Sequence, residues 1–203
     1  MANQLIECVP NFSEGRNSEV IQQIVHEIEQ TSGVNLLNVD SGKATNRTVV
    51  TFVGNPDSVI EAAFKLIKKA AQLIDMQKHS GEHPRMGATD VCPLIPVSGI
   101  SMKETISYSN KLAKRVGEEL NIPVYLYENS AKNTYRQNLA DIREGEYEGL
   151  KNKLQESQWI PDFGPKKFEL VKKSGATAIG ARDFLIAYNI NLNTTSTRRA
   201  NAI

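Results

Sequence analysis

The 203-residue sequence predicts an α/β domain of the α+β kind, in which a mixed β-sheet carries helices mainly on one face. Two patterns predict this class. Runs rich in β-branched residues alternate with segments whose apolar residues recur at helical spacing, and their order in the first half of the chain is that of a split β-α-β-β-α-β core. Because 40% of the residues are hydrophobic and 23% are charged, a chain of this length can bury one sizeable core.

The first half of the chain supplies the six elements of that core. They are, in order, a strand at 4–12, a helix at about 18–28, strands at 34–42 and 47–54, a helix opening at Pro56 and a strand at 90–97. Asn17 or Ser18 is the predicted N-cap of the first helix, and Pro56 suits the first turn of the second. The last strand, DVCPLIPV, contains two prolines, which favours a short strand at a sheet edge or a strand end.

The second half continues the alternation and then changes character. A helix is predicted at 101–120 and a strand at 122–128. Residues 129–159 are polar and charged, which indicates short surface helices with solvated charges. The density of Pro and Gly in 161–181 predicts a long loop, and 182–193 predicts a last strand.

Bulk composition excludes several classes of protein. The formal net charge is +1, with 24 basic and 23 acidic residues, so the chain has no basic field for a nucleic acid backbone. No segment approaches the ~20 apolar residues of a membrane span, and the N-terminus lacks the charged and apolar regions of a secretion signal. We therefore expect a cytoplasmic protein without nucleic acid or membrane partners. Cys8 and Cys92 lie in apolar runs, which predicts buried thiols in a reducing compartment.

Residues 79–90, HSGEHPRMGATD, carry two of the three histidines in the spacing H-x-x-E-H of zinc peptidases. A zinc pair of this kind needs a helix that projects both rings from one face. Gly81 and Pro84 oppose that helix, and His26 is a predicted surface residue, so we predict no metal site, with a zinc hydrolase as the alternative hypothesis. His83 lies among polar, irregular residues, where an unperturbed pKa of about 6.5 suits proton transfer better than a place in the core.

Six blocks of the chain, in order from Leu5 to the end, resemble the glutamate formiminotransferase family. They are LIECVPNFSEGRN, DSGKATNRTVVTFVG, HSGEHPRMGATDVCPLIPV, PVYLYE, PDFGP and SGATAIGARDFLIAYNINLN. The family's enzyme has N-terminal and C-terminal subdomains of similar α/β design with folate between them. The resemblance implies that residues 1–180 form the first subdomain and that residues 181–203 hold the first strand and the start of a truncated second. The helical pattern that begins after Thr194 and stops at Ile203 agrees with this expectation.

The resemblance implies the reaction of that family, in which a formimino group passes from N-formimino-L-glutamate to N5 of tetrahydrofolate during histidine degradation. Tetrahydrofolate is then a co-substrate, and no metal is required. The histidine of the E-H-P-R-M-G block is the family's catalytic residue, which maps to His83. Since N5 must lose a proton and the departing glutamate nitrogen must gain one, a single imidazole can serve as general base and then as general acid.

An acidic side chain is expected to orient His83 and to stabilise its charged form. Asp40, at the end of the run LLNVD, is the first candidate, with a plain turn role as an equal alternative. Glu82 is the second candidate, but in an extended segment its side chain points away from that of His83.

Binding residues also follow from the resemblance. The folate-binding stretch maps to ten consecutive residues: Gly164, Pro165, Lys166, Lys167, Phe168, Glu169, Leu170, Val171, Lys172 and Lys173. Its lysines would attract polyglutamate tails, and Phe168 would lie on a folate ring. Arg47 and Arg85 would bind substrate carboxylates bidentately, and Asn11 would hydrogen-bond the pterin. The alternative for each is an ordinary place on the surface or in a turn.

The resemblance also implies partners. The family forms dimers, so we expect a homodimer, and a separately encoded C-terminal subdomain is a second expected partner where the chain works in two pieces. The alternative function is a non-catalytic folate-binding or assembly fragment that lacks the C-terminal subdomain. Formimino and formyl donors place a one-carbon unit on the same nitrogen, so both stay open.

Overall fold

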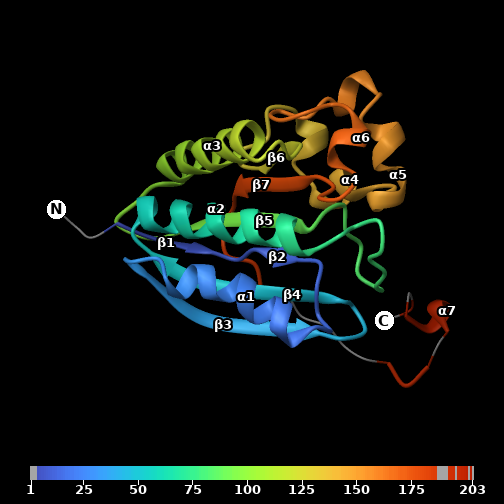
Figure 1. Cartoon of the computed structure of the whole chain (residues 1–203), viewed down its shortest axis with the longest axis horizontal. Coiled ribbons are helices and arrows are strands. Elements are labelled where there is room, and N and C mark those ends of the chain that lie inside the picture. The colour runs from blue at the N-terminus through green and yellow to red at the C-terminus, as the bar shows by residue number, and fades with distance from the viewer. Residues whose placement is uncertain (1–3, 187–191, 195, 201, 203) are drawn as a thin grey trace.

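The computed structural model describes residues 4–186, 192–194, 196–200 and 202. Its centre is a mixed seven-stranded sheet, which confirms the predicted fold class (Figure 1). The strands are β1 (Leu5–Cys8), β2 (Asn11–Phe12), β3 (Val34–Gly42), β4 (Arg47–Gly54), β5 (Thr89–Ser98), β6 (Val124–Glu128) and β7 (Thr177–Ala181). From one side of the sheet to the other they run β3, β4, then β1 and β2 end to end, β5, β7 and β6.

The predicted strand at 4–12 is divided into β1 and β2 by Val9 and Pro10. Both pieces lie between β4 and β5 and pair antiparallel with each. β3 also pairs antiparallel with β4, whereas the pairs of β5 with β7 and of β7 with β6 are parallel. The sheet is therefore antiparallel in its first half and parallel in its second.

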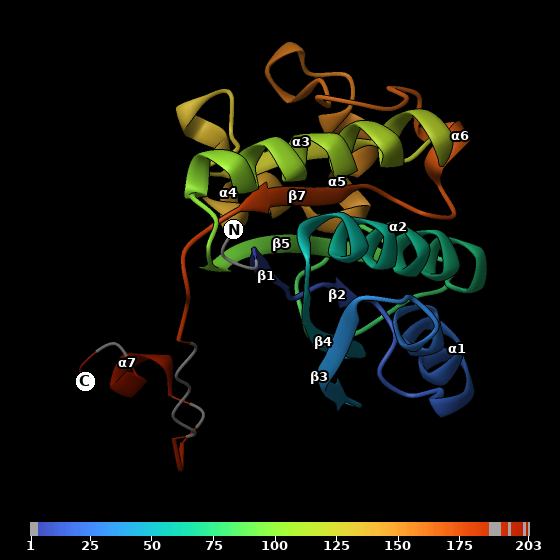
Figure 2. The ribbon, with the colours of Figure 1, turned by 90° about the vertical axis from the view of Figure 1, so that its left-hand side faces the viewer.

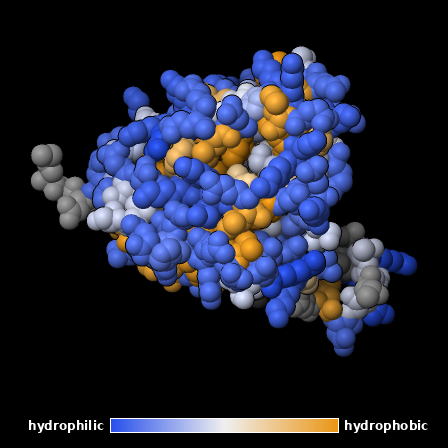
Figure 3. Space-filling view, viewed as in Figure 1, coloured by the Kyte–Doolittle hydropathy of each residue, from blue (hydrophilic) through white to orange (hydrophobic). Residues whose placement is uncertain are grey.

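Three long helices cover one face of the sheet (Figures 1 and 2). They are α1 (Ser18–Glu29), α2 (Pro56–Leu73) and α3 (Met102–Glu119), and α2 packs against both of the others. Figure 3 shows that hydrophilic side chains cover most of the outside of this layer. Alternate strand residues supply the core beneath it, since Ile6 and Cys8 of β1 and Phe52 of β4 are fully buried.

Side-chain caps explain where these helices begin. Asn17 accepts hydrogen bonds from the backbone N–H groups of Glu19 and Val20, which selects Asn17 over the other predicted N-cap, Ser18. Asn55 caps α2 directly before Pro56. At α3, Ser101 and Glu104 form a reciprocal capping box.

Two predictions about strands are wrong. The prolines of DVCPLIPV predict a short strand at a sheet edge or a strand end, but β5 has ten residues and is central, because β1 and β2 pair on one side and β7 on the other. Its prolines lie at interruptions of the ladder to β1. The carbonyl of Pro93 accepts from Val9, where β1 has ended, and Pro96 lies beside a register shift. A missing N–H is tolerated at such points.

The second wrong prediction concerns 161–181, which is not one long loop. It contains the short helix α6 (Phe168–Val171) and the inner strand β7. β7 has the sequence TAIGA, which contains no run of β-branched residues, so the sequence pattern does not predict a strand there. All five of its residues are nevertheless buried. Of the strand expected at 182–193, residues 182–186 are irregular and 187–191 lie outside the described residues. A short helix, α7 (Thr197–Ala200), lies where the terminal helical pattern was predicted.

The polar segment 129–159 forms the predicted short helices, namely η1 (Thr134–Arg136), α4 (Leu139–Arg143), α5 (Glu146–Lys153) and η2 (Ser157–Trp159). Its charges are not all solvated, so that part of the interpretation is wrong. Lys153 is buried, donates to the carbonyl of Ile142 and lies 4.2 Å from the ring centre of Trp159. Tyr125 of β6 donates to the carbonyl of Trp159, so the segment packs on the end of the sheet.

Cys8 and Cys92 are both buried free thiols, as predicted, and their sulfur atoms lie 3.5 Å apart. Burial raises the pKa of Cys8 well above its ordinary value. Within the described part of the chain, no helix is both long and apolar enough to cross a membrane.

Backbone hydrogen bonds join the segment before β5 to the segment before β7, and the two backbones meet at Gly87. The N–H of Ala88 donates to Ser174 (2.7 Å), and that of Ala176 donates to Met86 (3.0 Å). A Cβ atom added to Gly87 would lie 2.1 Å from the carbonyl oxygen of Ala176. Only glycine therefore allows this approach of two backbones.

We predict that Gly87→Ala destabilises the protein by about 1–3 kcal/mol, because the backbones must separate to admit the methyl group. Gly149→Ala in α5 is the matched control, since no atom lies within 4 Å of its added Cβ. It should stabilise the protein by about 0.5–1 kcal/mol, the helical preference for Ala over Gly. Urea unfolding measures both, and equal midpoints for the two variants would refute the role of Gly87.

Candidate active site

Residues 74–88, between α2 and β5, carry two histidines and form turns and bends without a helix. The helical face that an H-x-x-E-H zinc site requires does not form, in line with the effect predicted for Gly81 and Pro84. The two rings have different partners: His79 Nε2 lies 3.0 Å from the carbonyl oxygen of Asn46, whereas His83 Nε2 lies 2.6 Å from Arg47 Nη1. Among the described residues, no group of three or more His, Cys, Asp or Glu is placed to hold a metal ion.

His79 connects this loop to the turn before β4. Arg85 Nε donates to its Nδ1 (3.2 Å), so Nδ1 accepts and the ring proton lies on Nε2, which donates to Asn46. Burial lowers the pKa of His79, and the Arg85 charge lowers it further. Asn46 also donates to the carbonyl of Ser80 and accepts from the N–H of Gly15. His79 is therefore a neutral structural ring.

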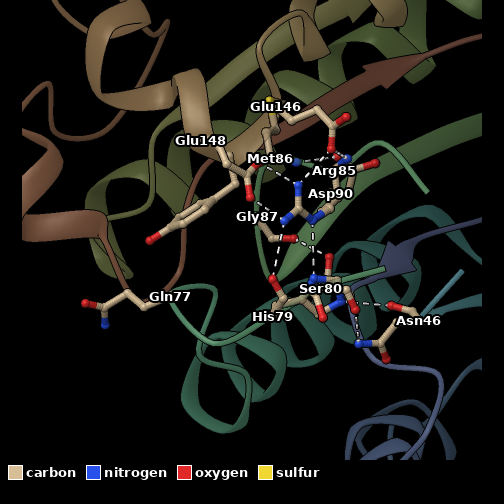
Figure 4. A network of polar contacts seen from close by, with 12 residues as sticks. Asn46, Gln77, His79, Ser80, Arg85, Met86, Gly87, Asp90, Glu146 and Glu148 are labelled. Carbon is tan, nitrogen blue, oxygen red and sulfur yellow. Dashed lines mark hydrogen bonds and ion pairs between the residues drawn. The ribbon is translucent and has the colours of Figure 1, made fainter. Parts of the chain in front are cut away.

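Arg85 lies at the centre of the polar network in Figure 4, and its side chain is only 7% exposed. Nη1 donates to Glu146 (2.7 Å) and Glu148 (2.8 Å), Nη2 donates to Glu148 (2.7 Å) and to the carbonyl of His79 (3.3 Å), and Nε donates to the His79 ring. These contacts use all five N–H groups of the guanidinium. The predicted binding of substrate by Arg85 stays a prediction, since in this structure its donors bind the protein itself.

Tyr147 of α5 extends the network to the predicted folate-binding stretch. Its N–H donates to the carbonyl of Arg85 (2.9 Å), its hydroxyl donates to the carbonyl of Lys172, and its ring centre lies 5.9 Å from that of Phe168. Phe168 is half-buried and Val171 is fully buried, so both anchor α6. The members exposed to solvent are Lys166, Lys167, Glu169, Leu170, Lys172 and Lys173. The stretch thus lies beside the histidine loop with its lysines outward, and its role in folate binding stays a prediction.

His83 is half-buried and contacts the guanidinium of Arg47, which also donates to Asn11 Oδ1 (3.0 Å). Because a guanidinium can only donate, His83 Nε2 accepts and the ring proton lies on Nδ1, a buried atom without a hydrogen-bond partner in the described part of the chain. Burial lowers the pKa of His83, and the charges of Arg47 and Arg143 lower it further. The ring is therefore neutral at neutral pH, which is the form of a general base.

The buried carboxylate near His83 is Asp90 of β5, which sequence reasoning missed. Asp90 is 1% exposed, accepts from the N–H of Met86 (3.0 Å) and pairs with Arg143 Nη2 from α4. Its charge raises the pKa of His83 and partly offsets the two arginines. The available signal was its position, because a carboxylate directly before the apolar run VCPLIPV is a candidate for burial.

The other acidic candidates lie elsewhere. Asp40 is exposed on β3, opposite Val49 of β4, and Glu82 is exposed in the loop. Among the described residues, neither makes a hydrogen bond or ion pair with His83. Asp40 acts on the site only at longer range, where its charge raises the pKa of Arg47. Its role as the partner of His83 stays a prediction that the geometry does not support.

A cavity of about 300 Å³ opens beside Arg47 on the face of the sheet away from the helix layer. Asn11 and Arg47, both predicted to bind substrate, line it together, and Arg143 and Arg182 join them. Arg143 comes from α4 and Arg182 directly follows β7, so neither could be assigned from a local motif. By contrast, the space enclosed by His79, His83, Arg85 and Asp90 has no room for a water molecule.

We predict that Arg85→Lys lowers stability by about 1–3 kcal/mol, because an ammonium group cannot make the forked contacts with Glu148 or the contact with His79. Arg16→Lys is the control, since Arg16 is exposed, and should change stability by less than about 0.5 kcal/mol. Urea unfolding and binding of glutarate, a dicarboxylate, are measured for both. Normal stability of Arg85→Lys together with weakened glutarate binding would instead make Arg85 a substrate ligand.

Comparison with known proteins shows the family to which this chain belongs. The model of the formiminotransferase domain, N-terminal subdomain, matches residues 5–182. Formimidoyltransferase-cyclodeaminase of Mus musculus is 58% identical over 193 residues, which are 95% of this chain and 35% of that protein. The protein of the same name from Dictyostelium discoideum is 54% identical over 190 residues, 94% of this chain and 35% of that protein.

A shorter relative gives the same result. Glutamate formimidoyltransferase of Streptococcus pyogenes serotype M1 is 49% identical over 191 residues, which are 94% of this chain and 63% of that protein. The chain therefore spans about a third of the two longer relatives and less than two thirds of the shorter one. Its match to the family model nevertheless covers most of its residues, and the chain belongs to the formiminotransferase family, in the region of the N-terminal subdomain.

Proposed function

We propose that this chain carries the catalytic histidine of a glutamate formiminotransferase. The reaction transfers a formimino group from N-formimino-L-glutamate to N5 of tetrahydrofolate, with His83 as general base and then general acid. One observation carries the proposal: the imidazole of His83 contacts Arg47, and Arg47 lines a cavity together with two further arginines. The name of the Streptococcus pyogenes relative, glutamate formimidoyltransferase, supports the choice of reaction.

The proton transfers follow from the chemistry of the two nitrogen atoms. N5 of the folate forms a bond to the formimino carbon and gives its proton to His83 Nε2. The bond from that carbon to the glutamate nitrogen then breaks, and the glutamate nitrogen takes the proton from His83. One group with a pKa near the working pH performs both steps, and the ring ends in its starting form.

The surroundings of His83 support both steps. Burial and the charges of Arg47 and Arg143 favour the neutral ring, which must accept the first proton. Once the ring is charged, the carboxylate of Asp90 stabilises it. Asp90 is itself fixed by Met86 and Arg143, so this stabilisation is in place before the substrates bind.

The division of the chain is a further part of the proposal. We propose that residues up to about 180 form the N-terminal subdomain and that residues from 181 onward belong to a second subdomain, which supplies the other wall of the folate site. The end of the family match at residue 182 supports this division. Folate contact along Gly164–Lys173, a homodimer and a cytoplasmic location are proposed on the resemblance to the family.

A second candidate function is a non-catalytic folate-binding or assembly fragment. The chain matches 35% to 63% of the length of these relatives, and a ligand held between two subdomains would need both. Calorimetry with folinate separates the two candidates. Micromolar binding by this chain supports a working site, and no measurable heat supports the fragment.

We predict that His83→Ala lowers the rate of formimino transfer at least about 100-fold, because general acid–base catalysis is lost. Folinate affinity should stay within about twofold, since the ring acts on protons more than on binding. His26→Ala is the control, because His26 is exposed on α1. Near-normal turnover by His83→Ala would end the proposed role.

We predict that kcat/KM, measured as a function of pH, falls on the acid side with a midpoint below the ordinary histidine pKa of about 6.5. This fall is the acid limb of the profile. The sign follows from the lowered pKa of His83, because the base stays neutral and active until the pH falls through that pKa. Arg47→Met removes one charge that lowers the pKa, so it should move the limb to higher pH. A limb above pH 6.5 in the unaltered protein would contradict the assignment.

A further inference from the structure

The cavity lined by Arg47, the residue that contacts His83, contains more positive than negative charge. Three guanidinium groups line it, from Arg47, Arg143 and Arg182, and Glu128 is the one carboxylate residue among the described residues of its lining. Arg143 is paired with Asp90. Arg47 and Arg182 have no carboxylate within ion-pair distance in the part of the chain that the structure describes. The net charge of the lining is therefore positive, and half-buried guanidinium groups without an ion pair favour an anionic ligand.

Arg47 is the arginine of this cavity that contacts His83. It is half-buried, and its contacts through Nη1 are to the neutral groups of Asn11 and His83. Burial lowers its pKa, the charge of Arg143 lowers it further, and Asp90 and Asp40 offset this in part. A carboxylate bound between Arg47 and Arg143 would remove the repulsion between them.

We propose that this cavity binds both carboxylates of the formimino donor, the α-carboxylate at Arg47 and Arg143 and the side-chain carboxylate at Arg182. This assignment rests on the proposed function. The α-carboxylate is attached to the carbon that bears the departing nitrogen, so it must lie near the group that protonates that nitrogen. Arg47 fulfils this condition because it contacts His83 Nε2.

The second carboxylate is separated from the first by three carbon atoms, and Arg182 lies further along β5. Arg143 is bound to Asp90, whereas the N–H of Arg182 donates to the carbonyl of Leu94 (3.0 Å). These two positions on β5 are about 13 Å apart at the usual rise of a strand. Arg143 and Arg182 both line the cavity. A volume of about 300 Å³ suits a molecule of the size of glutamate and is small for a folate.

Donor binding would also release the base. In this structure Arg47 Nη1 occupies the lone pair of His83 Nε2. A carboxylate is a stronger acceptor for Arg47 than a neutral imidazole, so the donor draws Arg47 away and frees Nε2. The charged groups around the ring are Arg47 from β4, Arg143 from α4, Asp90 from β5 and Arg85 from the loop itself, with Asp40 of β3 beyond Arg47. His83 thus becomes an available base only when the donor is present.

Glutarate tests the site without any transfer reaction, because it carries the two carboxylates and no formimino group. The chain has only three histidines, so the ring signals of His26, His79 and His83 can be followed separately by NMR. Glutarate should shift the signals of His83, raise the pH midpoint of its titration and leave His26 on α1 unchanged. Butyrate, with one carboxylate, should bind at least about tenfold more weakly.

Two variants test which arginine binds which carboxylate of the ligand. Arg182→Met should weaken glutarate binding about tenfold and remove the preference over butyrate. Arg143→Lys keeps a charge beside Asp90, so the fold is preserved, but it loses the forked donor and should weaken both ligands. Arg115→Met, in the helix layer, is the control and should bind as the unaltered protein does.

An unchanged His83 spectrum in glutarate, or normal glutarate binding by Arg182→Met, would overturn the inference. Failure of this inference can be distinguished from failure of the proposed function. Glutarate binding as described without formimino transfer would leave the site in place and refute the reaction. Formimino transfer at a normal rate in Arg182→Met would refute the proposed carboxylate site and leave the proposed reaction in place.

Discussion

The guanidinium of Arg85 is the interaction on which the site depends. A buried cation must have all of its donors satisfied, and here the five partners come from the histidine loop and from α5, more than sixty positions later in the chain. Through these contacts the loop has one position relative to the sheet. Tyr147 adds α6 to the same assembly, since it bonds both to Arg85 and to Lys172. The placement of His83 therefore follows from the neutralisation of a residue two positions away.

The two histidines show how such surroundings separate roles. His79 has both ring nitrogens in hydrogen bonds to the protein, and it stays neutral as a link between Arg85 and Asn46. His83 has one ring nitrogen against the guanidinium of Arg47, which faces an open cavity, and the other without a partner in the described part of the chain. The same residue type, four positions apart, thus gives one structural ring and one ring suited to proton transfer. Burial and nearby cations lower both pKa values, so the difference lies in the contacts.

The fold explains why the site lies on the face of the sheet away from the helices. Alternation along β4 sends Thr48, Val50 and Phe52 to the core and leaves Arg47 on the opposite side, where it meets Asn11 of β2. β5 brings Asp90 to the same place from the middle of the sheet. The helices supply the stability of the layer, while the opposite face holds the charged groups. This arrangement suits the proposed function, in which a second subdomain would cover the face that carries the charged groups.

Local chemistry in the sequence determined the helices α1, α2 and α3, their caps at Asn17, Asn55 and Ser101, most of the strands, and the irregular loop that Gly81 and Pro84 require. The residues of the resemblance also pointed to His83, Asn11 and Arg47, and the structure brings these three together. Tertiary structure alone decided the central place of β5, the strand β7 in a run of small residues, and the partners of the histidines. The pairing of Asp90 with Arg143 and of Arg85 with Glu146 and Glu148 joins residues 53 to 63 positions apart. Such pairs leave no local pattern, because the free energy of a buried charge depends on which distant group neutralises it, and only the folded chain selects that group.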